Sequence, residues 1–336
     1  MRTRRLGSAG PEITTVGFGS WAVGGPGKYG WGAVDDGESI AAIRHALDSG
    51  VNWIDTAAAY GLGHSEEIVG KAIEPFISGD NVYVFTKCGR SWYASESGKD
   101  LSYDLRPGSI RYECEESLKR LGVERIDLYQ LHWPDIRTGT AVEDSWATMG
   151  ELVDEGKVHR IGVSNFSVDL LQRCESVRHI DSVQPPLSMI NRWSRSDVIP
   201  WCARHDTGVI VYSPMGSGLL TGAFTRERID ALEPDDWRRN ASSFQSHNVW
   251  RTLELVEQLK AIAQRLEVTL AELVVAWALA TPGVTAAIVG GRAPAQVDGW
   301  ISAGDLDLDA PTMEEIERAI AETGAGTDEP PSPPQL

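Results

Sequence analysis

The stretch NWIDTAAAY, residues 52–60, decides how this chain of 336 residues is interpreted. Here an apolar run of strand length ends in Asp55, and Tyr60 follows shortly after it. Two further runs end in the same way, VYVFTK in Lys87 and LYQLH in His132. A carboxylate, a phenol, an ammonium and an imidazole at the ends of successive strands indicate a catalytic group rather than core packing. In an α/β barrel, residues in these positions all face one rim.

Segments with the character of strands and helices alternate along the whole chain. Most strand candidates are β-branched or apolar without strict alternation, as buried parallel strands are. Strands that alternate with helices are parallel and joined by right-handed crossovers. Eight strands are predicted, which favours a closed (β/α)8 TIM barrel, in one α/β domain over residues 1–325, above an open sheet. They are Thr15–Phe18, Asn52–Asp55, Val82–Lys87, Ile126–His132, Arg160–Ser164, Ser182–Gln184, Val209–Tyr212 and Ala287–Val289.

Helix signals fill the gaps between these strands. Asp36 is predicted to cap one helix, Ser65 begins another, and Pro107 opens a third that closes at Gly122. Further helices are predicted at Val142–Val153, Val168–Cys174, Arg251–Arg265 and Leu270–Ala280.

Three segments lie outside this pattern. The first ten residues or so are predicted to form a hairpin that closes the barrel floor. The connection from Pro214 to about Trp250 is far longer than a usual loop, which indicates either a functional role, such as a lid over the cofactor, or disorder. The tail, residues 326–336, is rich in proline and is predicted to be disordered.

Composition narrows the class of protein. A formal net charge of −17 argues against nucleic acid as a partner, because phosphate binding needs clustered cations. The N-terminus lacks the apolar core of a signal peptide, and no apolar run is long enough to span a bilayer. The four cysteines are scattered without a CxxC pair, as in an intracellular enzyme. We therefore expect a soluble, cytoplasmic protein.

The four polar residues at the strand ends suit one reaction. A phenol is a poor acid at neutral pH, and a neighbouring ammonium lowers its pKa by stabilising the phenolate. A buried ammonium in turn needs a carboxylate partner. Tyr60, Lys87 and Asp55 supply these three groups, and His132 orients a carbonyl oxygen or shares the proton. Tyr60 would then protonate a carbonyl while hydride arrives at its carbon.

Each of these residues also has an ordinary explanation when taken alone. Asp55 could be a cap or rim carboxylate, Tyr60 a packing aromatic, Lys87 a rim ion pair and His132 a structural histidine. Their coincidence at consecutive junctions favours the catalytic interpretation. A metal site formed by Asp55, His64 and His132 is disfavoured, since neither HxH nor HExxH spacing is present, and no metal is expected.

Several motifs in order along the chain resemble the aldo-keto reductase superfamily. They are DTAAAYG, TKCG, LHWPD, GVSNF, YSPMGSGLLTG and IVGGR, and the similarity is closest to the branch of bacterial reductases, inositol-type dehydrogenases and potassium-channel β-subunits. The resemblance implies a (β/α)8 barrel, a nicotinamide cofactor and reversible carbonyl reduction. It implies Tyr60 as general acid/base, Lys87 lowering its pKa, Asp55 paired with Lys87, and His132 steering the carbonyl.

The resemblance also implies where the cofactor lies. Ser164, Asn165 and Gln184 would bind the carboxamide, and Tyr212 would stack on the ring. The Gly-rich turn after the seventh strand would let backbone N–H groups approach the pyrophosphate. The residues expected there are Ser213, Pro214, Gly216, Gly218 and Leu219, and those expected after the eighth strand are Gly290, Gly291, Arg292 and Gln296. Arg292 favours NADP(H), with NAD(H) as the alternative, because a guanidinium can bind the 2′-phosphate.

Aromatic residues dominate the first βα loops. The candidates for the substrate side are Trp21, Tyr29, Trp31, Trp92 and Trp133, although a share of the twelve tryptophans should be core. The predicted function is an NADP-dependent oxidoreductase that reduces an aldehyde or ketone or oxidises the alcohol. The alternative is a cofactor-binding regulatory or scaffold subunit with slow chemistry. The substrate is not readable, and a homo-oligomer stays open.

Overall fold

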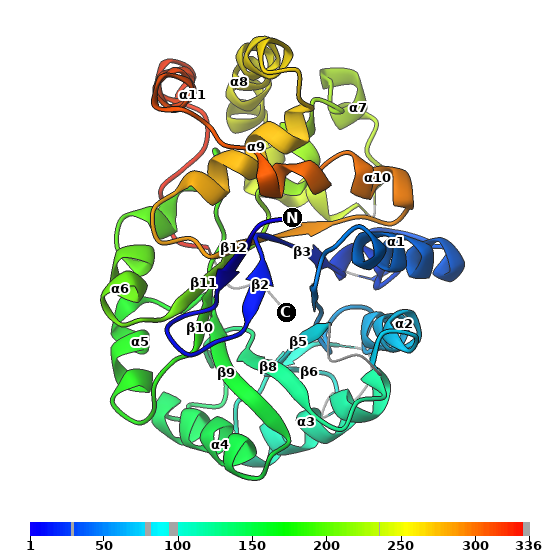
Figure 1. The fold of residues 1–336 in the computed structure, drawn as a ribbon, viewed down its shortest axis with the longest axis vertical. Coiled ribbons are helices and arrows are strands. Elements are labelled where there is room, and N and C mark those ends of the chain that lie inside the picture. Colours follow the sequence, from blue (N-terminus) through cyan, green and yellow to red (C-terminus); the bar gives the residue numbers. More distant parts are fainter. Residues whose placement is uncertain (28–29, 78–81, 94–99, 235, 332–336) are drawn as a thin grey trace.

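Eight parallel strands form a closed barrel in the computed structural model, which describes residues 1–27, 30–77, 82–93, 100–234 and 236–331. Around the barrel the strands follow the order β10-β11-β12-β3-β4-β5-β8-β9 (Figure 1). The bounds are β3 Val16–Gly19, β4 Trp53–Asp55, β5 Tyr83–Cys88, β8 Ile126–Leu131, β9 Val158–Ser164, β10 Ser182–Gln184, β11 Gly208–Val211 and β12 Ala286–Gly290. The predicted (β/α)8 barrel is confirmed.

The N-terminal residues form the predicted antiparallel hairpin, with strands β1 (Thr3–Arg5) and β2 (Glu12–Thr14). The hairpin closes one end of the barrel, where Ile13 is packed in the same buried cluster as Trp53. The indole Nε1 of Trp53 donates to the carbonyl of Thr14 at 2.8 Å. The open rim is therefore the other end, to which the carboxyl ends of the strands point.

Helices cover the outside of the barrel. They are α1 Asp36–Asp48, α2 His64–Ile73, α3 Pro107–Leu121, α4 Val142–Asp154, α5 Val168–Glu175, α6 Val198–Arg204, α7 Arg226–Asp230, α8 Ser246–Arg265, α9 Leu270–Ala280, α10 Pro294–Asp298 and α11 Ala310–Thr323. The predicted bounds of α9 are confirmed, and α3 begins at Pro107 and is capped by Gly122, as predicted. A second, short hairpin of β6 Arg90–Ser91 and β7 Ser102–Tyr103 was not predicted.

Three helix starts differ from the sequence prediction. The cap of α1 is Asp35, whose side chain accepts from the backbone N–H of Glu38, and not Asp36. Asp35 and Asp36 follow each other, and either side chain could cap a helix, so the sequence alone does not show which of them does. Helix α2 begins at His64 rather than Ser65, and α8 begins at Ser246 rather than Arg251.

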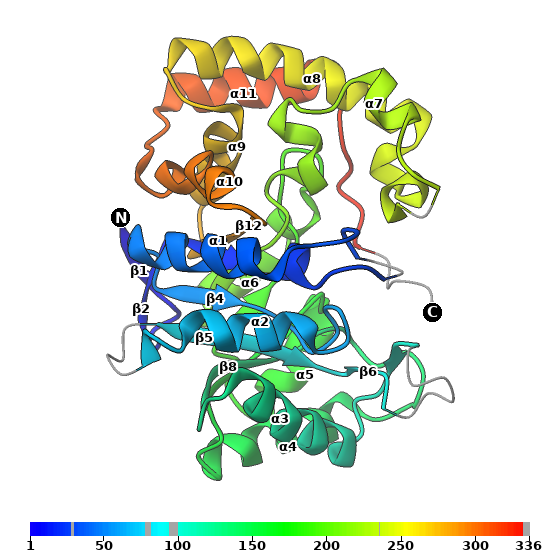
Figure 2. The same ribbon diagram turned by 90° about the vertical axis from the view of Figure 1, so that its right-hand side faces the viewer.

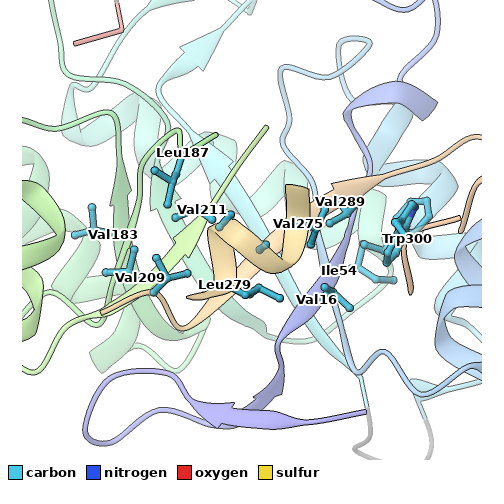
Figure 3. Packing of buried hydrophobic residues seen from close by; sticks show 14 of the residues in the cluster. Val16, Ile54, Val183, Leu187, Val209, Val211, Val275, Leu279, Val289 and Trp300 are labelled. Atoms are coloured by element: carbon cyan, nitrogen blue, oxygen red, sulfur yellow. The ribbon is translucent and has the colours of Figure 1, made fainter. Parts of the chain in front are cut away.

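The main hydrophobic core lies between the barrel and its helices. Figure 3 shows Val209 and Val211 of β11 beside Val275 and Leu279 of α9. These side chains are buried, and Trp277 on the same helix has no exposed surface. Burial of this apolar layer stabilises the barrel by about 25 cal/mol for each Å² removed from water, so the strand ends are held on a rigid frame.

The connection after β11 is built from short helices rather than from irregular chain. It contains η4 (Gly216–Thr221), α7, η5 (Trp237–Asn240) and η6 (Ser242–Phe244). Phe224 and Phe244 meet edge to face with ring centroids 5.4 Å apart, so the segment has a small apolar centre of its own. Figure 2 places α7 beside the paired helices α8 and α11.

The start of the predicted disordered tail is bound to the barrel side. Thr327 pairs with Asn191 in a parallel bridge, and its N–H donates to the carbonyl of Ile190 at 3.1 Å. Arg192 and Asp328 form an ion pair at 3.1 Å. These residues thus find partners far away in the sequence. Residues 332–336 lie outside the described part of the chain.

Within the described ranges, no helix is both long and apolar enough to cross a bilayer. The same residues contain no group of three or more His, Cys, Asp or Glu side chains placed to hold a metal ion.

Candidate active site

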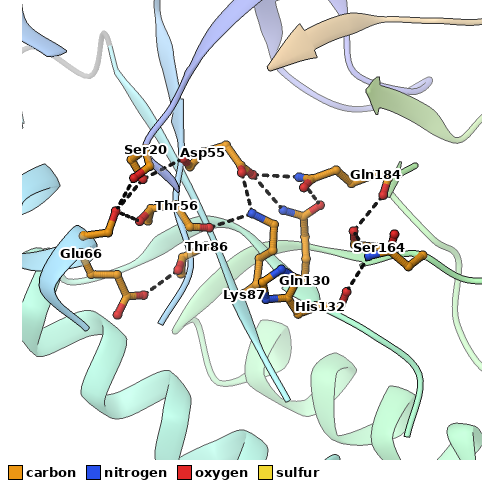
Figure 4. Close-up of polar contacts among 12 residues, drawn as sticks. Ser20, Asp55, Thr56, Glu66, Thr86, Lys87, Gln130, His132, Ser164 and Gln184 are labelled. Carbon is orange, nitrogen blue, oxygen red and sulfur yellow. Dashed lines mark hydrogen bonds and ion pairs between the residues drawn. The ribbon is translucent and has the colours of Figure 1, made fainter. Parts of the chain in front are cut away.

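Asp55 and Lys87 form a buried ion pair at the rim of the barrel. Asp55 is the last residue of β4, and Lys87 lies near the end of the neighbouring strand β5. The Nζ of Lys87 lies 2.5 Å from Oδ1 of Asp55 and 2.8 Å from the carbonyl oxygen of Thr56 (Figure 4). Parallel pairing brings these two strand ends together, so residues far apart in sequence meet in one contact.

Tyr60 and His132 lie against this pair. The Nζ of Lys87 is 5.3 Å from the centre of the Tyr60 ring. The rings of Tyr60 and His132 meet nearly at right angles, with centroids 5.7 Å apart. Tyr60 lies in the turn after β4, and His132 directly follows β8. All four residues predicted at the strand ends are thus gathered at one place on the rim.

The pKa of Tyr60 differs from the sequence expectation. Burial raises the pKa of Tyr60 well above its ordinary value of 10.0, and the charges of Asp55 and then Tyr212 raise it further. The expected lowering by Lys87 is not found. The main reason is desolvation of the buried phenol, to which the Asp55 carboxylate beside the ammonium adds, so the phenol is held protonated.

Burial also shifts the pKa values of Lys87 and His132. Desolvation lowers the pKa of Lys87, while the charge and hydrogen bond of Asp55 act in the opposite direction. Desolvation lowers the pKa of His132 well below 6.5, and the nearby cations Lys87 and Arg90 add to this shift. The imidazole is therefore neutral at pH 7, with one ring nitrogen able to donate a hydrogen bond.

Two buried glutamines hold the second oxygen of Asp55. Gln184 Nε2 at the end of β10 donates to Oδ2 at 2.8 Å, and Gln130 Nε2 on β8 lies 3.4 Å from the same atom. Gln184 also donates to Oε1 of Gln130 at 3.3 Å. Sequence analysis missed Gln130, although a polar residue inside the run LYQLH was a signal for it. The amides fix the carboxylate so that one oxygen faces Lys87.

A second chain of hydrogen bonds runs from β9 to β11. Asn165 has a φ of 65° and donates through Nδ2 to the carbonyl of His132 at 3.0 Å. The hydroxyl of Tyr212 donates to Oδ1 of Asn165 at 2.7 Å, and Ser164 Oγ donates to the carbonyl of Gln184 at 2.8 Å. The residues predicted to bind the carboxamide therefore lie together beside His132 (Figure 4).

The turn after β11 has an unusual backbone. Ser213, Gly216, Ser217 and Gly218 all have positive φ, at 57°, 57°, 57° and 96°. Successive residues in this region can turn their N–H groups toward one concave side, which suits an anion. A Cβ at Gly216 would come within 2.7 Å of the end of the Ile190 side chain, and the φ of 57° also favours glycine there. Pro214 and the buried Leu219 lie in the same segment.

The residues after β12 make contacts that the sequence did not predict. Gly290 ends the strand, Gly291 follows, and the backbone N–H of Arg292 donates to Oε1 of Gln296 at 2.7 Å. The guanidinium of Arg292 donates through Nη1 to the carbonyl of Trp31 at 3.1 Å. Arg292 therefore connects the proposed phosphate end of the site with the loop after β3.

The predicted tryptophans fall into separate groups. Trp21 lies 6.3 Å from the Tyr60 ring and 5.3 Å from Trp31, between ring centroids. Trp92 stacks on Tyr93 at 4.5 Å, beneath Arg120. Trp133 is buried directly after His132. Tyr29 lies outside the described residues. Sequence analysis did not predict Trp237, which joins Trp21 and Trp31.

The comparisons with known proteins agree with this geometry. A model described as the aldo/keto reductase family matches residues 15–321. The chain belongs to this family. It is accordingly an oxidoreductase that acts on carbonyl or CH–OH groups with NAD(P).

Three aldo/keto reductases resemble the chain over nearly its full length. Aldo-keto reductase YhdN of Bacillus subtilis is 36% identical over 96% of this chain and 95% of its own. An NADH-specific methylglyoxal reductase of Escherichia coli is 33% identical over 95% of this chain and 99% of its own. The solved structure of the glycerol dehydrogenase AKR11B4 from Gluconobacter oxydans is 33% identical, covers 99% and 98% of the two chains, and superposes with a TM-score of 0.86.

The rim of this aldo/keto reductase fits a nicotinamide dinucleotide. An amide, a hydroxyl and an aromatic ring lie together on β9, β10 and β11, beside the Tyr60–Lys87 pair. The positive-φ turn directly follows β11, and Arg292 follows β12. Among TIM barrels, phosphate sites favour the loops after strands seven and eight, which agrees with this order.

Proposed function

We propose that this enzyme reduces small, oxygen-bearing aldehydes and ketones with NADP(H), using Tyr60 as the proton donor. One observation carries the proposal: the phenol ring lies beside an ammonium that a carboxylate holds in place, and it meets a neutral imidazole nearly at right angles. The bound cofactor would supply the hydride. The residues of the chain would position the carbonyl and deliver the proton.

Reduction uses the protonated form of Tyr60. A phenol whose pKa lies well above 10.0 is protonated at neutral pH but is a weaker acid than free tyrosine, so donation depends on stabilisation of the phenolate. As negative charge develops on the carbonyl oxygen, the proton moves to it, and the phenolate that forms is stabilised by the nearby Lys87 ammonium. Asp55 acts through Lys87 and is a positioning residue, because it holds Nζ at 2.5 Å.

His132 would bind the carbonyl oxygen as a neutral donor. Its low pKa keeps a second positive charge away from Lys87. The backbone N–H of His132 donates to the carbonyl of Cys88 at 3.0 Å, and Asn165 holds its carbonyl oxygen, so the ring is carried on a fixed backbone. This fixed position lets His132 orient the substrate toward Tyr60.

Four residues would hold the nicotinamide. Ser164, Asn165 and Gln184 present hydroxyl and amide groups for the carboxamide, and Tyr212 offers a ring face for stacking. The positive-φ turn from Ser213 to Gly218 would bind the pyrophosphate through partially positive N–H groups other than those of Gly216 and Gly218, which donate to the carbonyls of Ser213 and Met215. These assignments rest on the neighbourhood of the groups at one rim.

Arg292 supports NADP(H) over NAD(H). A guanidinium has five N–H donors, and the hydrogen bond to the Trp31 carbonyl uses one of them. The others can bind a 2′-phosphate in the bidentate manner that Arg favours. The related methylglyoxal reductase is named as NADH-specific, so the preference within this family varies and needs measurement.

The names of two relatives guide the choice of substrate. Methylglyoxal and glycerol, in the names of two of them, are three-carbon compounds with more than one oxygen. We propose that this enzyme acts on the same class of compound, by reduction or oxidation according to the cofactor ratio.

All four cysteines are free and buried, which suits a reducing, cytoplasmic compartment. The net charge of −17 makes nucleic acid an unsuitable partner.

A substrate panel tests the proposal. Glyceraldehyde, methylglyoxal, propanal and acetone are each offered with NADPH and with NADH, and cofactor oxidation is followed at saturating substrate. Turnover of the oxygen-bearing compounds with NADPH supports the proposal. Tight NADPH binding in calorimetry without turnover of any compound would instead favour a regulatory, cofactor-binding role.

A further inference from the structure

A second buried carboxylate, that of Glu66, holds β5 from outside the barrel. Glu66 lies on α2, and its Oε1 accepts a hydrogen bond of 2.5 Å from Oγ1 of Thr86 (Figure 4). Both residues are buried. Thr86 directly precedes Lys87, and side chains alternate between the two faces of a strand, so these two point to opposite sides of the barrel wall. The hydrogen bond therefore fixes the strand just where the ammonium side chain leaves it.

The other oxygen of Glu66 is bound by a cation. Nε of Arg120 on α3 lies 2.7 Å from Oε2, and Nη1 of Arg120 donates to the hydroxyl of Tyr93 at 2.6 Å. The side chain of Glu66 has no exposed surface, and that of Arg120 exposes 12%. A carboxylate held at both oxygens does not turn away from Thr86. The contact between α2 and β5 is therefore a fixed one.

Glu66 lies in the first turn of the helix that follows Tyr60. The backbone N–H of the preceding residue, Ser65, donates to the carbonyl of Tyr60 at 3.2 Å. The hydroxyl of Ser65 lies 2.8 Å from Oγ of Ser20 and 3.0 Å from Oγ1 of Thr56. The start of α2 is thus bound through Ser65 to the turn that carries the phenol, and through Glu66 to the strand that carries the ammonium.

The contacts at Nζ do not by themselves set the position of Lys87. Asp55 and the Thr56 carbonyl bind the end of a long side chain, whereas Thr86 holds the backbone from which it starts. The attraction between the ammonium and a developing phenolate falls as their distance grows, and Nζ lies 5.3 Å from the ring centre of Tyr60. A displacement of β5 away from Tyr60 would therefore weaken the stabilisation of the phenolate.

We propose that Glu66 and Thr86 are positioning residues, which keep β5 and hence the Lys87 ammonium in register with Tyr60. Both act through Lys87 from the outer side of the barrel wall. Their loss should slow proton transfer without weakening the binding of substrate or cofactor. The inference rests on the proposed role of Tyr60 as proton donor, and it adds the contact that sets the distance between phenol and ammonium.

Thr86→Val tests the inference directly. Valine keeps the β-branched shape and removes the hydroxyl, while the pair of Glu66 with Arg120 stays in place. With NADPH and the compound of the substrate panel that is reduced fastest, we expect kcat to fall by about threefold to tenfold, as the loss of one hydrogen bond predicts. KM and the dissociation constant of NADPH should stay within about twofold of the wild type.

The solvent isotope effect shows whether the proton step is the one that slows. We expect the ratio of kcat/KM in light water to that in heavy water to be larger for Thr86→Val than for the wild type, because proton transfer from Tyr60 then limits the rate more strongly. A variant that only packs badly lowers the fraction of active enzyme and leaves this ratio unchanged. Calorimetric titration with NADPH gives the fraction of competent sites.

Glu66→Asp breaks the same contact from the other side. This change keeps the charge and shortens the side chain by one methylene, so the carboxylate no longer reaches both Thr86 and Arg120. We expect the same fall in kcat and the same rise in the isotope effect. Because both changes remove one hydrogen bond, the double variant Glu66→Asp/Thr86→Val should lose no more than about twofold in kcat beyond either single variant.

Two variants serve as controls. Thr86→Ser keeps the hydroxyl, and we expect its kcat to stay within about twofold of the wild type and its isotope effect to be unchanged. Thr252→Val removes another buried hydroxyl, which donates within α8 to the carbonyl of Asn248 at 3.0 Å. This variant should behave as the wild type in both measurements. Thermal unfolding of every variant shows whether it is folded.

The outcomes separate this inference from the function on which it rests. A wild type that turns over no compound of the panel contradicts the proposed function, and the inference with it. An unchanged isotope effect in Thr86→Val, whether or not kcat falls, overturns the inference alone, and so do additive losses in the double variant. A loss in Thr86→Ser as large as that in Thr86→Val would mean that packing matters rather than the hydroxyl, and overturns it as well.

Discussion

The Nζ of Lys87 lies 2.5 Å from Oδ1 of Asp55, and the two side chains expose 0% and 3% of their surface. A pair so deeply buried gains little net stability over an apolar replacement, since desolvation of both charges offsets their attraction. Its value is positional, because it places a cation 5.3 Å from the ring centre of Tyr60. The surrounding amides of Gln130 and Gln184 orient the carboxylate for this contact.

Removal of Asp55 alone should damage stability and activity together. Asp55→Ala leaves Lys87 buried without its carboxylate partner, and we expect a loss of about 3–5 kcal/mol in the free energy of unfolding. Urea unfolding measures this loss. The double variant Asp55→Leu/Lys87→Met should recover most of the stability and none of the turnover. Equal instability of the single and double variants would contradict the paired arrangement.

Tyr60→Phe should abolish most turnover without loss of cofactor. The ring keeps its packing against Trp21 and His132, while the proton donor is gone, so we expect kcat to fall by about 10²–10⁴-fold. Single-turnover reduction and calorimetric titration with NADPH measure the two effects. Tyr112→Phe, at an exposed position, is the control. Wild-type kcat in Tyr60→Phe would exclude this phenol from the mechanism.

Reduction and oxidation should differ in their dependence on pH. Burial raises the pKa of Tyr60, so its protonated form persists to higher pH than that of free tyrosine. Reduction, which uses the phenol, should stay level through pH 9, whereas alcohol oxidation, which uses the phenolate, should keep rising with pH. The lowered pKa of His132 predicts no loss of reduction between pH 8 and 6.5. Profiles of kcat/KM in both directions test this, and a reduction rate that falls between pH 7 and 8 would refute the assignment.

Arg292→Ala should change the choice of cofactor. The loss of one charge-assisted contact to the 2′-phosphate weakens NADPH by about tenfold to a hundredfold and affects NADH less. Dissociation constants for both cofactors give the ratio. Because Arg292 also holds the Trp31 carbonyl, we expect some rise in the substrate KM as well. An unchanged cofactor ratio would mean that another residue binds the phosphate.

Local pattern was sufficient to predict the barrel and the four residues at its rim. Runs of β-branched residues, helix caps and Pro–Gly signals depend on neighbours in sequence, so β10 and α9 were predicted with their observed bounds. Because neighbouring parallel strands end at one edge, the pattern of strand ends is enough to place Asp55 and Lys87 together. The family resemblance then assigned roles that composition could not.

Contacts between distant segments were decided only by the tertiary structure. The sequence contains no local signal that Gln130 contacts Asp55 in particular, that Arg292 binds the Trp31 carbonyl, or that Trp237 reaches Trp21. Thr327 likewise lies in a proline-rich tail but pairs with Asn191. The raised pKa of Tyr60 belongs to the same group, since burial depends on what packs around a side chain. The sequence determines which side chains stand at the strand ends of the rim. Long-range packing determines their neighbours and their solvation, and hence their chemistry.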